Sequence, residues 1–168
     1  TRNLAGTDIG VYYDIDTKFG DFGFKYIGSK TDEFTQDASG EFAFLQSQKE
    51  AGLIPANIPL DGFGDLLGMD GNYDTKHTVK ASWRMGDWGA TMSMLQKGEF
   101  YQNSLTLSDG TRYVIPEMTT IDATVSYSFR MNGNKARLRF AVKNLEDERA
   151  PLADRYYGYY ADAHQDYG

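Results

Sequence analysis

The chain has 168 residues, of which 24% are charged and 14% aromatic, with a formal net charge of −7 and no cysteine. The negative charge argues against a nucleic-acid surface, which needs clustered excess Lys and Arg, and the lack of cysteine excludes disulfides, thiolate metal sites and cysteine nucleophiles. The mean hydropathy of −0.55 excludes a helical membrane span but not a membrane β-strand, in which only alternate residues are apolar.

Six segments alternate apolar and polar residues with the period of a β-strand. They comprise residues 8–16, 21–28, 77–85, 88–97, 120–131 and 136–143. In the last four segments every charged residue falls on one face, and no comparable helical periodicity accompanies them. The pattern therefore predicts an all-β chain whose sheet has one apolar and one polar face.

The connections between these segments alternate between short and long. The short ones are rich in turn residues and cover residues 17–20, 86–87 and 132–135. The long ones cover about residues 29–76, 98–118 and 144–168. This order places the tight turns at one end of an antiparallel up-and-down meander and the long loops at the other, as in outer-membrane barrels with short periplasmic turns and long extracellular loops. On that pattern one more strand should follow the last loop.

Three features favour an apolar face that looks out to lipid. The fifth segment alternates over 12 residues, whereas a mean globular strand has about 5–6 and a tilted membrane strand about 9–11. The apolar face of the last four segments carries no charge, and a cation there would cost about 2–4 kcal/mol at the bilayer midplane. Aromatic residues gather beside the short turns, as an interfacial girdle requires: Tyr13, Phe22, Trp83, Trp88, Tyr127 and Phe129. A soluble β-sandwich binding module with the same alternation remains an alternative.

The closing residues resemble those of a known family. The stretch "VKNLEDERAPLADRYYGYYADAHQDYG" is similar to the end of TonB-dependent outer-membrane receptors, in which an Asn-Leu-Phe-Asp-like motif ends the penultimate strand and a loop with Pro and Tyr follows. The matching residues are Asn144, Leu145, Glu146 and Asp147, then Pro151, with Glu146 in place of the usual aromatic. The stretch "PEMTTIDATVSYSF", residues 116–129, resembles this family's strand before the penultimate one.

The resemblance implies a transmembrane β-barrel of about 22 strands in the bacterial outer membrane, with an N-terminal plug in its lumen. Residues 1–168 would form a six-strand part of that barrel near its C-terminal end, without the plug and the last strand. Six strands are too few to close alone, because single-chain barrels begin at about 8 strands and an open edge in lipid would leave backbone groups unpaired.

The resemblance also implies a function and a set of partners. The function is the import of a scarce, bulky nutrient, such as a ferric siderophore, when the TonB complex acts on the plug. The expected partners are the rest of the barrel and its plug, outer-membrane lipid and lipopolysaccharide, and the small-molecule nutrient, with no cofactor and no nucleic acid. A passive porin-type barrel would share the strands and turns and stays open as an alternative.

No catalytic constellation is present, so no enzyme is expected: the chain lacks a nucleophile elbow, an HExxH motif, a Walker loop and a dinucleotide fingerprint. His77 opens a strand and is expected to be structural or interfacial. Within the acidic residues 61–74, the stretch "DGNYD" imitates the start of a calcium loop. Thr75 stands where that loop requires Gly, and Ala81 where it requires Glu, so we expect a solvated acidic loop and no metal, with a loose cation site as the alternative.

Two groups of residues are candidates for binding. Basic residues on the polar face are expected to face the lumen, where they contact the plug or attract an anionic substrate, unless they only pair with neighbouring carboxylates. They are Lys80, Arg84, Arg130, Arg137 and Arg139. The second group lies in the last loop, where rigid aromatic side chains on an extracellular surface are suited to contact a ligand. It comprises Tyr156, Tyr157, Tyr159, Tyr160 and His164.

Overall fold

A computed structural model of the chain describes residues 1–55, 58, 60 and 62–151. Six long strands form one antiparallel sheet in the order β1-β2-β4-β5-β8-β9, so that strands adjacent in space follow one another along the chain. Their bounds are β1 (Arg2–Thr17), β2 (Gly20–Gln36), β4 (Thr75–Met85), β5 (Trp88–Lys97), β8 (Met118–Met131) and β9 (Asn134–Val142). The all-β prediction is confirmed: five of the six alternating segments lie within one of these strands, and the sixth, 136–143, extends one residue past the end of β9.

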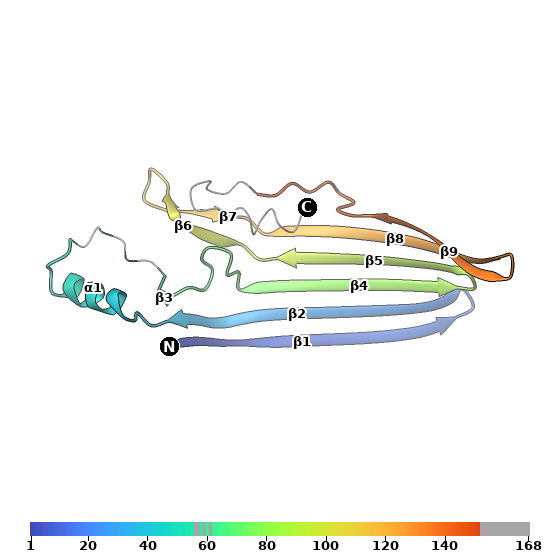
Figure 1. The fold of residues 1–168 in the computed structure, drawn as a ribbon, viewed down its shortest axis with the longest axis horizontal. Helices are drawn as coiled ribbons and strands as arrows, with labels where there is room; N and C mark the ends of the chain where they lie inside the picture. The colour runs from blue at the N-terminus through green and yellow to red at the C-terminus, as the bar shows by residue number, and fades with distance from the viewer. Residues whose placement is uncertain (56–57, 59, 61, 152–168) are drawn as a thin grey trace.

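The two ends of the sheet differ in how the strands are connected (Figure 1). At one end lie the tight turns of the β1–β2, β4–β5 and β8–β9 hairpins. At the other end lie the long connections, which hold α1 (Glu41–Glu50), β3 (Gly64–Asp65) and a separate hairpin of β6 (Phe100–Thr106) and β7 (Arg112–Ile115). We call these the turn end and the loop end.

The expected loop bounds 29–76 and 98–118 are too wide. Strand β2 continues to Gln36 because its ladder with β1 continues, although residues 29–36 are polar apart from Phe34 and show no apolar alternation. Helix α1 begins after Gly40 without a side-chain cap. None of its residues is buried, and its apolar residues do not gather on one side of the helix, so the sequence shows no helical hydrophobic period. The β6–β7 hairpin closes around Asp109 and Gly110, a turn signal inside what was predicted to be an irregular loop.

The tight turns are built by glycine and by local hydrogen bonds. Gly20 has a φ of 111°, which disfavours L side chains, and the Trp83 Nε1–H donates to the Phe19 carbonyl 2.8 Å away. Asn132 and Gly133 have φ values of 52° and 81°, as a two-residue hairpin turn with positive φ at both positions requires. These turns fix the register of the hairpins, and with it the face on which each side chain lies.

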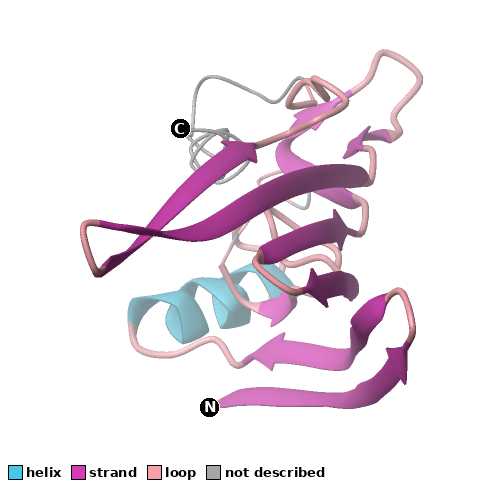
Figure 2. Cartoon of the chain, turned by 90° about the vertical axis from the view of Figure 1, so that its right-hand side faces the viewer, coloured by secondary structure: helices cyan, strands magenta, loops and turns pink. Residues whose placement is uncertain are grey.

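The sheet is a single twisted layer when seen from the turn end (Figure 2). It is open in the described part of the chain, where β1 pairs only with β2, and β9 only with β8. The sheet also packs against no second sheet there, because β6 and β7 pair with each other at the loop end. The soluble-sandwich alternative needs such a second layer to bury the apolar face.

Candidate functional site

The apolar residues of the six strands line up in rows across one face of the sheet. The row nearest the turn end that spans all six strands consists of Ile15, Phe22, Trp83, Ala90, Val125 and Phe140. The next row consists of Tyr13, Phe24, Ala81, Met92, Ala123 and Val142. These side chains stay uncovered: Val125 is 44% exposed and Phe140 68%. An apolar surface that continues across six strands far exceeds the scattered exposure of a soluble protein.

Aromatic side chains with polar groups mark both boundaries of this apolar face. Near the turn end, the ring centroids of Trp88 and Tyr127 are 4.6 Å apart and those of Tyr127 and Phe129 are 6.0 Å apart. Toward the loop end, the Tyr26 hydroxyl is hydrogen-bonded to His77 Nδ1 at 2.9 Å. Tyr26 reaches this position by lying over Gly28, where a Cβ atom would collide with its hydroxyl. Amphipathic rings at two levels are typical of the two interfaces of a membrane barrel.

The apolar face shifts along the strands from β1 to β8. At the loop end the apolar face starts at Ile9 on β1. The β8 residue in the same cross-strand row is Thr119, but on β8 the apolar face starts at Ile121, two positions closer to the turn end. At the turn end the face ends at Ile15 on β1, and on β8 it runs six positions past the level of Ile15, to Met131. With about 3.3 Å per residue and 4.8 Å per strand, this drift corresponds to strands inclined by about 20–45° to the apolar band. Strands of outer-membrane barrels are inclined by about 35–45°.

The height of the band also suits a membrane. On β8 the apolar face runs from Ile121 to Met131, ten residue steps, or about 33 Å along the strand. After correction for the inclination this gives about 23–31 Å, compared with an apolar band of about 25 Å in outer-membrane barrels.

The opposite face is polar and forms a concavity of about 500 Å³ near the turn end. Of the five basic residues predicted to face the lumen, Arg84, Arg137 and Arg139 line it. Lys80 lies farther toward the loop end, opposite Lys25, and Arg130 lies beside the β8–β9 turn, opposite Lys135. The concavity therefore brings together three of the five, and the other two lie on the same polar face outside it.

Acidic residues line the concavity as well. Asp14, Asp16 and Asp21 line it from β1 and β2, where Asp21 lies directly opposite Arg84, and Asp87 lines it from the β4–β5 turn. The sequence alternation predicts that Asp14 and Asp16 lie on the polar face. It does not identify them as neighbours of the arginines, because their alignment depends on the register across several strands. Among the described residues, no ion pair within 4.0 Å joins these carboxylates to the arginines.

Two acidic residues of the stretch 61–74, Asp65 and Asp70, form hydrogen bonds at the loop end. The Asp70 carboxylate accepts the Asn103 N–H at 3.0 Å, and the Asp65 carboxylate accepts the Leu67 N–H at 3.0 Å. Backbone bonds reinforce the first contact, since Asp70 N–H donates to the Tyr101 carbonyl and Tyr101 N–H to that of Gly68. Asp65 remains exposed to solvent, whereas the Asp70 contact is half-buried and joins the two long loops. Among the described residues, no group of three or more His, Asp or Glu side chains is placed to hold a metal ion.

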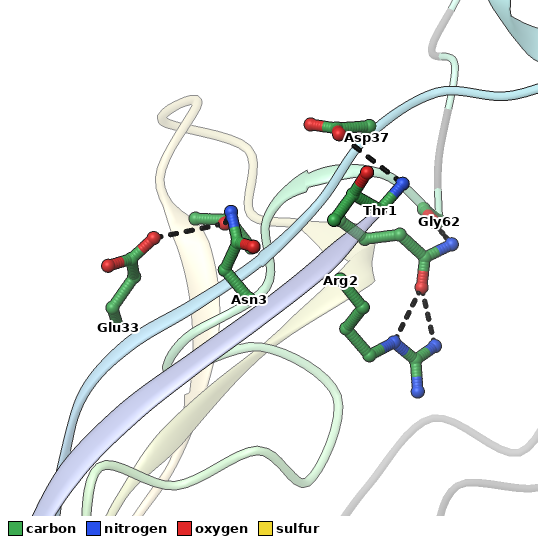
Figure 3. A network of polar contacts seen from close by, with 8 residues as sticks. Thr1, Arg2, Asn3, Glu33, Asp37 and Gly62 are labelled. Atoms are coloured by element: carbon green, nitrogen blue, oxygen red, sulfur yellow. Dashed lines mark hydrogen bonds and ion pairs between the residues drawn. The ribbon is translucent and has the colours of Figure 1, made fainter.

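The most buried side chains of the described residues lie in the same two long loops. We call Leu66, Met69, Gln102 and Ile115 the loop core, with exposures of 7%, 9%, 0% and 2%. A second set of contacts ties the strand ends to the same region (Figure 3). Arg2 Nε donates to Gln36 Oε1 at 2.9 Å, and Gln36 Nε2 donates to the Gly62 carbonyl at 2.9 Å. The loop end is thus an ordered platform attached to β1 and β2.

The candidate ligand residues Tyr156, Tyr157, Tyr159, Tyr160 and His164 lie outside the described residues, so their role stays a prediction. Comparison with protein-family models, curated proteins and solved structures finds no match for this chain. No helix within the described ranges has the length and apolarity needed to cross a membrane.

Proposed function

We propose that this chain forms part of the wall of an outer-membrane β-barrel of the TonB-dependent receptor type, which imports a scarce, bulky nutrient. The observation that carries the proposal is the uncovered apolar band, bounded by aromatic residues at both levels and inclined to the strands. In water, such a band would aggregate or require a second layer, whereas in a bilayer it is matched by lipid.

The two open edges fit the same proposal. A strand edge in hydrocarbon must be paired, because no water is present to satisfy its backbone N–H and C=O groups. Strands β1 and β9 would therefore pair with further strands of a larger barrel, for which the family resemblance suggests about 22 in total. The polar face then lines the lumen, and the platform at the loop end lies outside the cell.

The receptor class and its substrate depend on the resemblance over residues 116–168. That resemblance favours a TonB-dependent receptor with a plug over a passive porin-type barrel, and a ferric siderophore as the nutrient. Uptake of an iron chelate by cells with and without TonB separates the two: the receptor loses uptake without TonB, and a passive barrel retains it.

An arginine scan along β8 tests the lipid-facing band. Arginine at the outward positions Ala123 and Val125 should destabilise the folded protein in lipid bilayers by about 2–4 kcal/mol, falling to about 0–1 kcal/mol toward the interface at Phe129. Arginine at the inward positions Thr124 and Ser126 serves as the matched control and should cost far less. In a soluble sheet whose apolar face is already wet, outward arginines would be tolerated. Equal costs at the outward and inward positions would contradict lipid exposure.

A further inference from the structure

Two apolar residues interrupt the polar face of the sheet between the concavity and the loop end. Ile27 on β2 and Leu95 on β5 are exceptions to the alternation of their strands. The register places Thr78 of β4 directly between them, opposite Ile27 on one side and opposite Leu95 on the other. All three side chains are half-buried. They form one short apolar row with a hydroxyl group at its centre.

Lysine residues flank this apolar row at both ends of the strands. Toward the turn end Lys25 lies directly opposite Lys80, and toward the loop end Lys76 lies directly opposite Lys97. Directly opposite Cβ atoms are about 4.5–5.5 Å apart, and like charges in this arrangement destabilise a strand pair. Along β4 the two lysine pairs are separated by about 13 Å. We call the four lysines and the apolar row between them the lysine patch.

The carboxylates on the polar face around the lysine patch are those of Asp8, Asp14 and Asp122. Asp8 and Asp122 are each two strand intervals, or about 10 Å, from the nearest patch lysine in their cross-strand rows, and Asp14 is diagonal to Lys25. Among the described residues, no ion pair within 4.0 Å joins a carboxylate to Lys25, Lys76 or Lys80. These carboxylates therefore leave the repulsion between Lys25 and Lys80 in place.

We propose that the lysine patch binds a small molecule with an apolar body and at least two acidic groups. Acidic groups beside the lysine pairs relieve their repulsion and accept charge-assisted hydrogen bonds, while the apolar body covers Ile27 and Leu95. Small-molecule sites commonly combine an apolar lining with a few placed polar groups in this way. An inorganic anion fits less well, because it leaves the apolar row uncovered. The inference rests on the proposed function, in which this face lines the lumen, and names the chemical class of the nutrient.

Isothermal titration calorimetry of the full-length protein with dinitrostilbene disulfonate tests the proposal, because this probe carries two sulfonates on an apolar body. Binding should weaken about tenfold or more in Lys25→Gln/Lys80→Gln, since two charge-assisted hydrogen bonds are lost. Leu95→Asn should weaken binding by removing an apolar contact, whereas Lys25→Arg/Lys80→Arg should retain it. Lys18→Gln/Lys135→Gln removes the same charge at the turn end, so this matched control should bind the probe as the parent protein does. Sulfate alone should bind far more weakly than the disulfonate.

Heat-modifiable mobility of each variant reports separately on barrel assembly. An assembled barrel that does not bind the probe would overturn the patch proposal and leave the proposed function standing, and this is the result expected if another part of the protein covers the patch. Probe binding that is unchanged in Lys25→Gln/Lys80→Gln, or sulfate binding as tight as that of the disulfonate, would overturn it as well. A parent protein that never shows a heat-modifiable barrel would overturn the proposed function, and the patch proposal with it.

Discussion

The six-strand sheet and the loop core differ in where their stability comes from. The hydrophobic side chains that are buried in the described residues, Leu66, Met69 and Ile115, all lie at the loop end and none lies in the sheet. In an ordinary soluble protein the sheet supplies the core and the loops lie on its surface. Here the loops have a small core of their own, while the sheet is held by its backbone ladder and local turns. The stabilisation that a hydrophobic core gives to other sheets must come here from whatever covers the two faces of the sheet.

The largest expected effect tests whether the loop core is an independent unit. Ile115→Ala should destabilise it by about 2–5 kcal/mol, because the removed atoms leave a cavity in a fully packed site. Hydrogen exchange of the Tyr101 amide, which donates to Gly68, measures the loss. Val114→Ala, at a neighbouring side chain that is 48% exposed, is the control and should change stability by less than about 0.5 kcal/mol. An equal loss of protection in β4 and β5 would show that sheet and loop core unfold together.

The next prediction tests the sheet through a tight turn. Gly20→Ala should destabilise the β1–β2 hairpin by about 1–3 kcal/mol or more, because Gly20 has a φ of 111° and the new methyl group would collide with the Arg84 carbonyl oxygen. Gly86→Ala, at a φ of 57° with no atom near the added Cβ, should cost only about 1–2 kcal/mol. Denaturation of the folded protein in detergent micelles compares the two, and a larger effect at Gly86 would contradict the proposed packing of the first turn.

A smaller effect is expected at the contact that joins the two long loops. Asp70→Ala removes the acceptor of the Asn103 N–H and also places Ala at a φ of 50°, so we expect a loss of about 1–3 kcal/mol in the loop core. Asp70→Asn keeps an acceptor oxygen and tolerates positive φ, so it should retain most of the stability. Hydrogen exchange of the Asn103 amide reads out both variants. Equal losses of stability in Asp70→Ala and Asp70→Asn would show that the negative charge of Asp70 stabilises the loop core, and not the presence of an acceptor oxygen.

The same contrast explains what the sequence could predict. Strand positions and faces follow from a local period of two residues, so the alternation over Ile121–Met131 was enough to place β8 within two residues. The tight turns follow from adjacent residues such as Asn132 and Gly133. The meeting of acidic and basic residues on the polar face was hidden, because it depends on the cross-strand register that places Asp21 opposite Arg84 and in one row with Arg139.

The loop core could not be predicted for a similar reason. Its central contact joins Asp70 to Asn103, residues 33 apart in sequence, and no periodic pattern marks either segment. Helix α1 was missed because none of its residues is buried, so its sequence shows no apolar face. Features set by neighbouring residues, such as strands and tight turns, could be predicted from the sequence, and features that depend on contacts between distant segments could not.

The smallest expected effect concerns pH and the tip of the β6–β7 hairpin. The Thr111 hydroxyl and then the Thr111 backbone N–H donate to the Asp109 carboxylate and hold its pKa below the ordinary value of 3.8. A lowered pKa means that the charged carboxylate stabilises the turn above pH 3.8, and that this contribution is lost as the pH falls through the lower pKa of the folded state. Exchange of the Leu107 amide, which donates to the Thr111 carbonyl, should therefore lose part of its protection between about pH 5 and pH 2 after correction for intrinsic rates. In Asp109→Asn this pH dependence should disappear, and the amides of β4 and β5 should show none in either protein if the tip titrates independently of the sheet.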